Sequence, residues 1–501
     1  MISLGAEATP PLTRLALGRR PVRVPVLAGE QPLELPATVM RAMVELSMER
    51  IVRHIETLPE QPIHAVVGGK KLARALREPM PERGVSFERL LRLLFGRVIP
   101  TSLNTASPGY LAYIPGGGLF HAAVADLIAD ATNRYVGVWQ AAPGLVQLET
   151  NVLDWFCGAM GFPAGSGGLL TTGGSLANLV AMITARRERL PPEFQRGVVY
   201  TSDQAHHSVV KAAVLAGLLP DRVRSIASDE HLRIRVEALE QAVRADREAG
   251  LLPFCLVGSA GTTNTGAVDD LAALAAVAKR HALWFHVDGA YGGFFALTER
   301  GKAALRGIEQ ADSVTLDPHK GLFLPYGTGC LLVRDRATLR RAHAMHADYL
   351  PPMQSDEDLV DYCELGPELS RDARGLRVWL PLKMHGAGAF RAALDEKLDL
   401  ARRAAAALAA LPHIEIVAPP ELSLFAFRVR PPGVEAGRDL DALNKRLLAA
   451  VNAKQHVLLT GAVLSSGFVL RVCVLSFRTH AERIDACIDD VRASLVEVGV
   501  G

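Results

Sequence analysis

The chain has 501 residues, of which 49% are hydrophobic and 22% are charged, and its formal net charge at neutral pH is +2. This length is too great for one compact core, so we expect two or three domains. The near-neutral charge gives no basis for binding nucleic acid or an acidic membrane surface, and no apolar run reaches the roughly 18 residues that span a bilayer.

The N-terminal stretch changes character near residue 40. Residues 1–37 carry six prolines and scattered arginines, which predicts an extended arm without the pattern of a secretory signal. Apolar residues from Met40 to Ile55 fall on one helical face, and a second helix is expected over 86–95. Two such helices cannot bury their apolar faces alone. They are expected to pack on the rest of the chain or on a second subunit.

Two glycine-rich stretches follow. Residues 107–118 mix aromatics, prolines and glycines, which suits a pocket wall and an ordinary surface loop equally. Thr171-Thr172-Gly173-Gly174-Ser175 stands directly before a helical pattern that runs to about residue 187. A helix start with glycines and a serine hydroxyl is suited to one phosphate group, and a plain helix cap is the alternative. The stretch matches neither a Walker loop nor the dinucleotide fingerprint.

Three buried strands end in polar side chains. His206 follows the strand at 197–200, where it can lie flat on an aromatic cofactor or face water. After a strand at 253–260, the apolar run 283–287 ends in Asp288, a pattern typical of a central parallel strand. A buried carboxylate needs a cationic partner, which a protonated pyridine nitrogen provides. A salt bridge or a helix cap is the alternative for Asp288.

The run 311–316 ends in Asp317-Pro318-His319-Lys320. A lysine amine forms a Schiff base with an aldehyde when it is uncharged, and burial at a strand end favours the uncharged form. Alone, the tripeptide Pro318-His319-Lys320 favours a surface lysine in a connection between a strand and a turn. Together with the phosphate site, the imidazole and the carboxylate, it predicts that Lys320 holds pyridoxal 5'-phosphate (PLP).

The combination resembles the fold-type I PLP enzymes and, within them, the aromatic-L-amino-acid decarboxylase family, also called group II decarboxylases. The likeness runs from about residue 40 to the C-terminus. The stretches that carry it are 202–206, 286–291, 317–320, 370–379 and 470–473. It implies an α/β fold with a mainly parallel, seven-stranded type of sheet, an N-terminal helical segment and a C-terminal α+β domain.

The resemblance also implies roles for individual residues. Lys320 carries the cofactor, Asp288 pairs with the pyridine nitrogen and His206 stacks on the ring. The remaining cofactor contacts are Gly174, Ser175 and His319 at the phosphate, and Thr263 and Ala290 beside the ring. The substrate contacts are Tyr113, Ile114 and Pro115, with Gly116 giving extra room, and Ser370, whose hydroxyl suits a phenolic or imidazole side chain.

Tyr349 matches a loop tyrosine that protonates the substrate carbon after CO₂ leaves, and relatives with phenylalanine there form an aldehyde. Decarboxylation of an L-amino acid, most simply an aromatic one, is therefore expected, with no metal. Four alternatives stay open: decarboxylation of a glutamate, aspartate, histidine or diaminobutyrate type of substrate; carbon–carbon cleavage; transamination; and a silent PLP-binding scaffold. Arg471 is expected either to bind a substrate carboxylate or to be structural.

The predicted organisation has three parts. Residues 1–95 form the arm and a helical dimerisation segment, 96–385 the PLP-binding domain and 386–501 a small α+β domain. A homodimer with shared active sites is expected. The six cysteines lie far apart without a CxxC pair, which is typical of reduced, buried thiols in a cytoplasmic protein.

Overall fold

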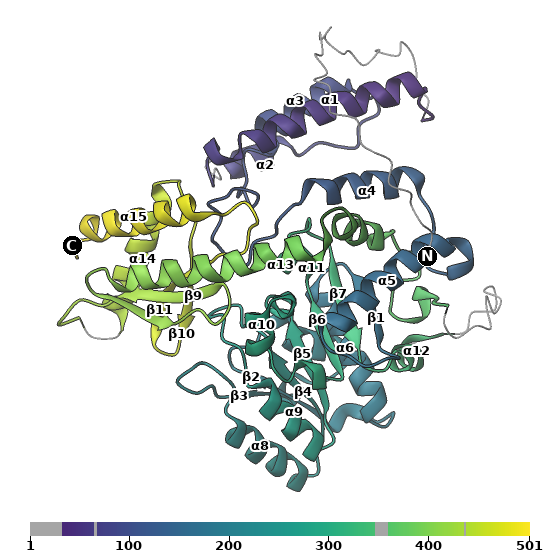
Figure 1. Cartoon of the computed structure of the whole chain (residues 1–501), viewed down its shortest axis with the longest axis vertical. Helices are drawn as coiled ribbons and strands as arrows, with labels where there is room; N and C mark the ends of the chain where they lie inside the picture. The colour runs from purple at the N-terminus through teal and green to yellow at the C-terminus, as the bar shows by residue number, and fades with distance from the viewer. Residues whose placement is uncertain (1–32, 65–67, 346–358, 435–436, 501) are drawn as a thin grey trace. The chain divides into compact units, whose positions relative to one another are not determined.

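The computed structural model describes residues 33–64, 68–345, 359–434 and 437–500. It divides into two compact units, residues 1–103 and residues 104–501. The helices expected over 40–55 and 86–95 are confirmed in the first unit (Figure 1). The helices of this unit are α1 (Ala37–Glu56), α2 (Gly69–Ala75) and α3 (Phe87–Leu93), the last followed by a π-helical turn over Leu94–Val98.

Helix α1 leaves most of its apolar stripe uncovered. Only Val39 and Ala42 are buried among its residues. Met40, Val44 and Val52 are exposed by 50%, 45% and 40%. Burying such side chains stabilises a protein by roughly 25 cal/mol for each Å² of apolar surface. These three apolar side chains are left exposed on α1.

The second unit is built on a seven-stranded sheet of order β1-β7-β6-β5-β4-β2-β3. Neighbouring strands from β3 to β6 are parallel, whereas β7 is antiparallel to both β6 and β1. The expected mainly parallel α/β sheet is confirmed. Its strands are β1 (Gly167–Thr171), β2 (Gly197–Ser202), β3 (Val223–Ile226), β4 (Leu252–Ser259), β5 (Trp284–Gly289), β6 (Ser313–Leu316) and β7 (Gly329–Val333).

Helices cover both faces of this sheet (Figure 1). Alternate residues of β5 show the division, because Trp284 packs with residues of α6 and α7 while Phe285 packs with residues of α8 and α9. The helices of this part are α4 (Phe120–Thr132), α5 (Pro143–Ala159), α6 (Gly174–Arg189), α7 (His207–Leu215), α8 (Val236–Glu248), α9 (Leu271–Arg280), α10 (Glu299–Ala304), α11 (Pro318–Gly321) and α12 (Ala337–His343).

The C-terminal part has an antiparallel four-stranded sheet of order β10-β11-β9-β8 with its own apolar core. The long helix α13 is kinked at Gly386, which has a φ of 70°. Because α13 continues through residue 386, a domain boundary there stays a prediction. The elements are α13 (Arg374–Ala409), β8 (Ile414–Ala418), β9 (Leu424–Val429), α14 (Arg438–Ala453), β10 (Thr460–Leu464), β11 (Gly467–Cys473) and α15 (Ala481–Glu497).

Two further expectations concern the chain as a whole. All six cysteines are buried and unpaired, as predicted. Within the described ranges, no helix is both long enough and apolar enough to cross a membrane. Those ranges also hold no group of three His, Cys, Asp or Glu side chains placed to bind a metal ion.

Candidate active site

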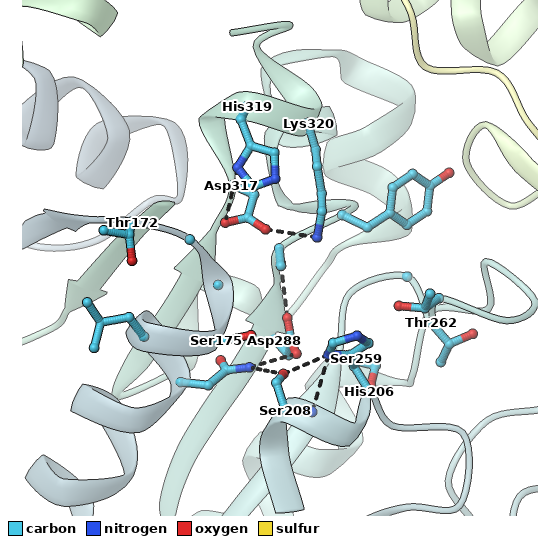
Figure 2. A pocket seen from close by; sticks show the side chains of 18 residues that line it. Thr172, Ser175, His206, Ser208, Ser259, Thr262, Asp288, Asp317, His319 and Lys320 are labelled. Atoms are coloured by element: carbon cyan, nitrogen blue, oxygen red, sulfur yellow. Dashed lines mark hydrogen bonds and ion pairs between the residues drawn. The ribbon is translucent and has the colours of Figure 1, made fainter. Parts of the chain in front are cut away.

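A cavity of about 310 Å³ lies where β4, β5 and β6 end and α6 begins. This is the carboxyl edge of the parallel strands, where ligands of open α/β sheets bind. In Figure 2, Lys320 and His319 point into the cavity from one side and His206 lies across it, with Asp288 between them. The lining includes every residue expected to contact the cofactor: Gly174, Ser175, His206, Thr263, Asp288, Ala290, His319 and Lys320.

Lys320 is positioned by the short connection between β6 and α11. Its Nζ lies 2.8 Å from Oδ2 of Asp317, whose side chain is only 3% exposed. Burial lowers the pKa of Lys320, but the charge and hydrogen bond of Asp317, with a smaller effect from Asp288, outweigh burial and leave the pKa raised. The expected effect of burial, which favours the uncharged amine, is present, but it is outweighed by Asp317, which the sequence argument did not pair with Lys320.

The beginning of α6 offers donors to an anion. No side chain caps this helix, so its first backbone N–H groups are left for another partner. Ser175 is exposed beside them. His319 uses Nδ1 for the carbonyl oxygen of Thr328, at 2.7 Å, which leaves Nε2 as its free ring nitrogen. Burial lowers the pKa of His319. An anion such as a phosphate group fits this end of the cavity.

Asp288 ends β5 and is 8% exposed. Its Oδ1 accepts a hydrogen bond from the backbone N–H of Ala290 at 3.1 Å, and its Oδ2 accepts one from Asn178 at 3.0 Å. It makes no ion pair with any lysine or arginine of the described ranges. A buried carboxylate beside a cavity and without a cation suits a protonated ring nitrogen.

His206 precedes α7 and accepts at Nδ1 from the backbone N–H of Ser208, at 3.3 Å. Burial lowers its pKa, with Asp288 opposing this effect. Thr263 lies in the loop after β4. Arg471 donates to the carbonyl oxygens of Thr263 and Asn264 in this loop. Arg471 therefore stabilises the loop that carries Thr263 on the cavity wall. This is a structural role, one of the two alternatives that the sequence analysis gave for Arg471.

The expected substrate residues do not line this cavity, as far as the described chain goes. Tyr113 is 56% exposed and has a φ of 51°, which is uncommon outside glycine. Ile114 and Pro115 are buried. The extra room expected at Gly116 is not there, because a Cβ atom at this position would lie 2.8 Å from the ring of Tyr326.

Ser370 is exposed and lies away from the cavity lining. Its neighbour Arg371 is buried and pairs with Glu149 at 2.6 Å. Glu149 also accepts from the backbone N–H of Leu170 in β1, so this pair ties the segment before α13 to the sheet. Tyr349 lies outside the described residues, and its role stays a prediction.

Several lining residues were given no role from the sequence, among them Asn178, Ser208 and Asp317. Asn178 lies on α6, three residues after Ser175, which places it close to the same helical face. Ser208 is two residues after His206. The spacing of these two residues from Ser175 and His206 gave a weak indication that they lie near the site. Asp317 belongs to the motif 317–320, but its ion pair with Lys320 was recognised only in the structure.

A lysine, an unpaired carboxylate, an imidazole and an uncapped helix start around one cavity define the site of a PLP-dependent enzyme. Comparison with known proteins agrees. A family model described as the pyridoxal-dependent decarboxylase conserved domain matches residues 70–430. The chain belongs to the pyridoxal-dependent decarboxylase family, and it is a PLP-dependent amino-acid decarboxylase, a carboxy-lyase.

Individual relatives cover nearly the whole chain. An aromatic-L-amino-acid decarboxylase from Bacillus atrophaeus is 35% identical over 93% of this chain and 98% of its own length. A phenylacetaldehyde synthase from Arabidopsis thaliana is 29% identical over 87% of this chain and 91% of its own. The crystal structure of Oryza sativa TDC with PLP and tryptamine superposes with a TM-score of 0.88 at 28% identity, covering 93% of this chain and 99% of that one.

Proposed function

We propose that this enzyme converts an aromatic L-amino acid to the corresponding amine and CO₂. The observation that carries the proposal is the joint presence of Lys320, Asp288 and His206 in one cavity, in a chain 35% identical to an aromatic-L-amino-acid decarboxylase. The cavity volume of about 310 Å³ falls at the lower end of the range of roughly 300–1,000 Å³ for small-molecule sites.

The proposed mechanism assigns a task to each of these side chains. Bound PLP supplies an aldehyde and an electron-withdrawing ring that stabilises a carbanion. Lys320 would hold the cofactor covalently, Asp288 would keep a proton at its ring nitrogen, and His206 would contact its ring. The start of α6 holds the phosphate through backbone N–H groups.

The last step is a proton delivered to the substrate carbon. We assign it to Tyr349, on the resemblance of residues 347–350 to the loop of the family. Aldehyde formation is the second candidate, because relatives of this chain include a phenylacetaldehyde synthase. The presence of tyrosine at 349 favours the amine.

We further propose a homodimer whose two copies share active sites. The uncovered stripe of α1 supports an apolar contact, and the exposed positions of Tyr113 and Ser370 suit residues that complete a cavity across an interface. A cytoplasmic location remains part of the proposal, on the strength of the buried, unpaired thiols.

The test is turnover by the purified holoenzyme with a panel of L-amino acids. Tyrosine, tryptophan, phenylalanine and histidine represent ring substrates, and glutamate, aspartate and diaminobutyrate represent the others. Amine and CO₂ formed in equal amounts from a ring substrate, at the highest kcat/KM of the panel, is the expected result. A preference of tenfold or more for an acidic substrate would overturn the aromatic assignment.

A further inference from the structure

Behind the cavity, a chain of buried hydrogen bonds converges on Asn178. This side chain is 2% exposed and lies on α6. One amide N–H donates to Oδ2 of Asp288 at 3.0 Å. Its Nδ2 also donates to Oγ of Ser208 at 3.0 Å, and Ser208 Oγ lies 2.7 Å from Nδ1 of His206. A single amide therefore contacts Asp288 directly and His206 through one hydroxyl.

The carbonyl end of the same amide is held from β5 and β6. Thr315 donates its hydroxyl to Oδ1 of Asn178 at 2.7 Å, and Nε2 of His286 lies 3.1 Å from the same atom. Nδ1 of His286 lies 2.8 Å from Oγ of Ser313, which accepts from the indole N–H of Trp284 at 2.8 Å. All of these side chains except Asn178 come from two neighbouring strands. His286 pairs with Ser313 in the register of those strands, and Asp288 pairs with Thr315.

The direction of the bonds in this chain follows from Asp288. A carboxylate only accepts, so the amide nitrogen of Asn178 faces Asp288 and the amide oxygen faces His286. An amide oxygen also only accepts, so the proton of neutral His286 is on Nε2. Nδ1 of His286 then accepts the hydroxyl proton of Ser313, which itself accepts from the indole N–H of Trp284. Burial lowers the pKa of His286 to about 4, which agrees with a neutral ring.

At the other end, the backbone N–H of Ser208 donates to Nδ1 of His206, so that nitrogen is an acceptor. The hydroxyl of Ser208 accepts from Asn178 and can therefore give its proton to the same nitrogen. This leaves the proton of His206 on Nε2. The orientation of the Asn178 amide is thereby fixed, with its oxygen toward His286 and its nitrogen toward Asp288. Hydrogen bonds in such a chain polarise one another, which strengthens the last donor.

We propose that Asn178 is a positioning residue of the active site, which aligns Asp288 and His206 with the two protons of one amide, and that Trp284, Ser313 and His286 fix its orientation. The inference rests on the proposed roles of Asp288 and His206 at the cofactor ring. Its consequence is that the carboxylate and the imidazole are arranged before the cofactor binds. The network should therefore be present in the protein with and without PLP.

The first experiment replaces Asn178 by alanine in the holoenzyme. We expect kcat to fall roughly ten- to hundredfold, the effect of losing one hydrogen bond to a charged group, with KM for the amino acid changed less than about threefold. The absorbance of the bound cofactor, measured against pH without substrate, should shift its midpoint. The matched control is Asn444→Ala. Asn444 is also buried, but it bonds to the backbone of Val429 in β9 and of Leu440 in α14. Its loss should therefore lower the melting temperature and leave kcat and the spectrum unchanged.

The second experiment separates hydrogen bonding from packing at His286. Glutamine and leucine have similar volumes, but only glutamine can donate to the amide oxygen of Asn178. His286→Gln should keep kcat within about threefold, and His286→Leu should lose about tenfold or more. Nitrogen-15 NMR of the imidazoles should place the His286 proton on Nε2 in both the apo and the PLP-bound protein. Trp284→Phe keeps an aromatic ring but removes the indole N–H together with part of the ring volume. It tests the chain by the position of the His286 proton if Asn178→Ala fails to fold.

The outcomes distinguish this inference from the proposed function. Normal kcat in Asn178→Ala and His286→Leu, with strong loss in Asp288→Asn, overturns the positioning role and leaves the site assignment standing. Normal kcat in Asp288→Asn overturns the site assignment itself. A His286 proton on Nδ1, or equal losses in His286→Gln and His286→Leu, would also contradict the donor chain.

Discussion

The Nζ atom of Lys320 lies 2.8 Å from Oδ2 of Asp317, within one buried turn after β6. Burial alone lowers the pKa of Lys320, but the paired carboxylate more than compensates, and the pKa is raised. The ion pair therefore favours the ammonium form of Lys320. Since only the uncharged amine attacks an aldehyde, we expect this pair to slow the uptake of PLP by the apo protein.

The first prediction concerns the pH dependence of cofactor loading. The uncharged fraction of Lys320 grows as the pH rises toward its raised pKa, so the loading rate of the apo protein should increase with pH. Asp317→Asn removes the negative charge that raises the pKa of Lys320. The rise of the loading rate should therefore occur at a pH that is lower by about one unit or more. Near neutral pH the variant should load about tenfold faster, measured by stopped-flow absorbance. A slower or unshifted profile would show that the ion pair does not limit loading.

The second prediction is that Lys320 carries the cofactor. Borohydride treatment of the holoenzyme followed by peptide mapping should place the pyridoxyl label on Lys320. Lys320→Ala should lose the label and the visible absorbance of the bound cofactor. The control is Lys397→Ala, since Lys397 is buried in the C-terminal part and bonds to Glu396 and Thr479. This control should keep the label. A label on a lysine other than Lys320 would contradict the assignment of the cofactor to Lys320.

The third prediction concerns the charge of Asp288. Asn at this position keeps the shape and removes the charge that holds a proton at the ring nitrogen. We expect Asp288→Asn to bind PLP and to lose at least a hundredfold in kcat, about 2.7 kcal/mol of transition-state stabilisation. Steady-state kinetics with cofactor content measured on the same sample provide the check. A kcat within threefold of the wild type rules out the electrostatic role.

The fourth prediction addresses the product. Tyr349→Phe removes a hydroxyl that PLP binding does not require, so cofactor content should be unchanged. Amine output should fall, because the substrate carbon has lost its acid. The carbanion should instead be oxidised by dioxygen and hydrolysed by water, giving aldehyde, ammonia and hydrogen peroxide. Amine and peroxide are assayed together on the same sample. Unchanged amine without peroxide would remove Tyr349 from the mechanism.

The fifth prediction tests the homodimer. Val44→Glu places a charge on the exposed apolar stripe of α1, where Val44 is 45% exposed in the single chain. Light scattering should give a dimer for the wild type and a larger monomer fraction for the variant, with activity falling in parallel. The matched change Glu45→Gln, on an exposed residue beside the stripe, should leave the dimer intact. A fully active wild-type monomer would contradict the proposal.

Much of the cofactor site could be predicted from the sequence, and the reason is topological. His206, Asp288 and Lys320 each follow an apolar run, and parallel strands end at one edge of their sheet. Residues separated by more than a hundred positions were therefore expected to meet. The structure confirms that they line one cavity. The glycines before α6 could be recognised for the same local reason, because a helix start leaves its N–H groups free.

Other features were decided only by the tertiary structure. The sign of the pKa shift at Lys320 depends on which rotamers bring it to Asp317, and the room at Gly116 depends on where the ring of Tyr326 packs. The orientation of Asn178 follows from Asp288, His286 and Thr315, whose spacing from it has no sequence pattern. The sequence by itself determined the strand ends and their chemistry, since these follow from local periodicity. The conformation of one turn decided that Asp317 pairs with Lys320, although both residues stand in the same motif. Packing between distant segments decided the filling of the pocket wall and the partners of the carboxylate, because these depend on contacts that no local pattern encodes.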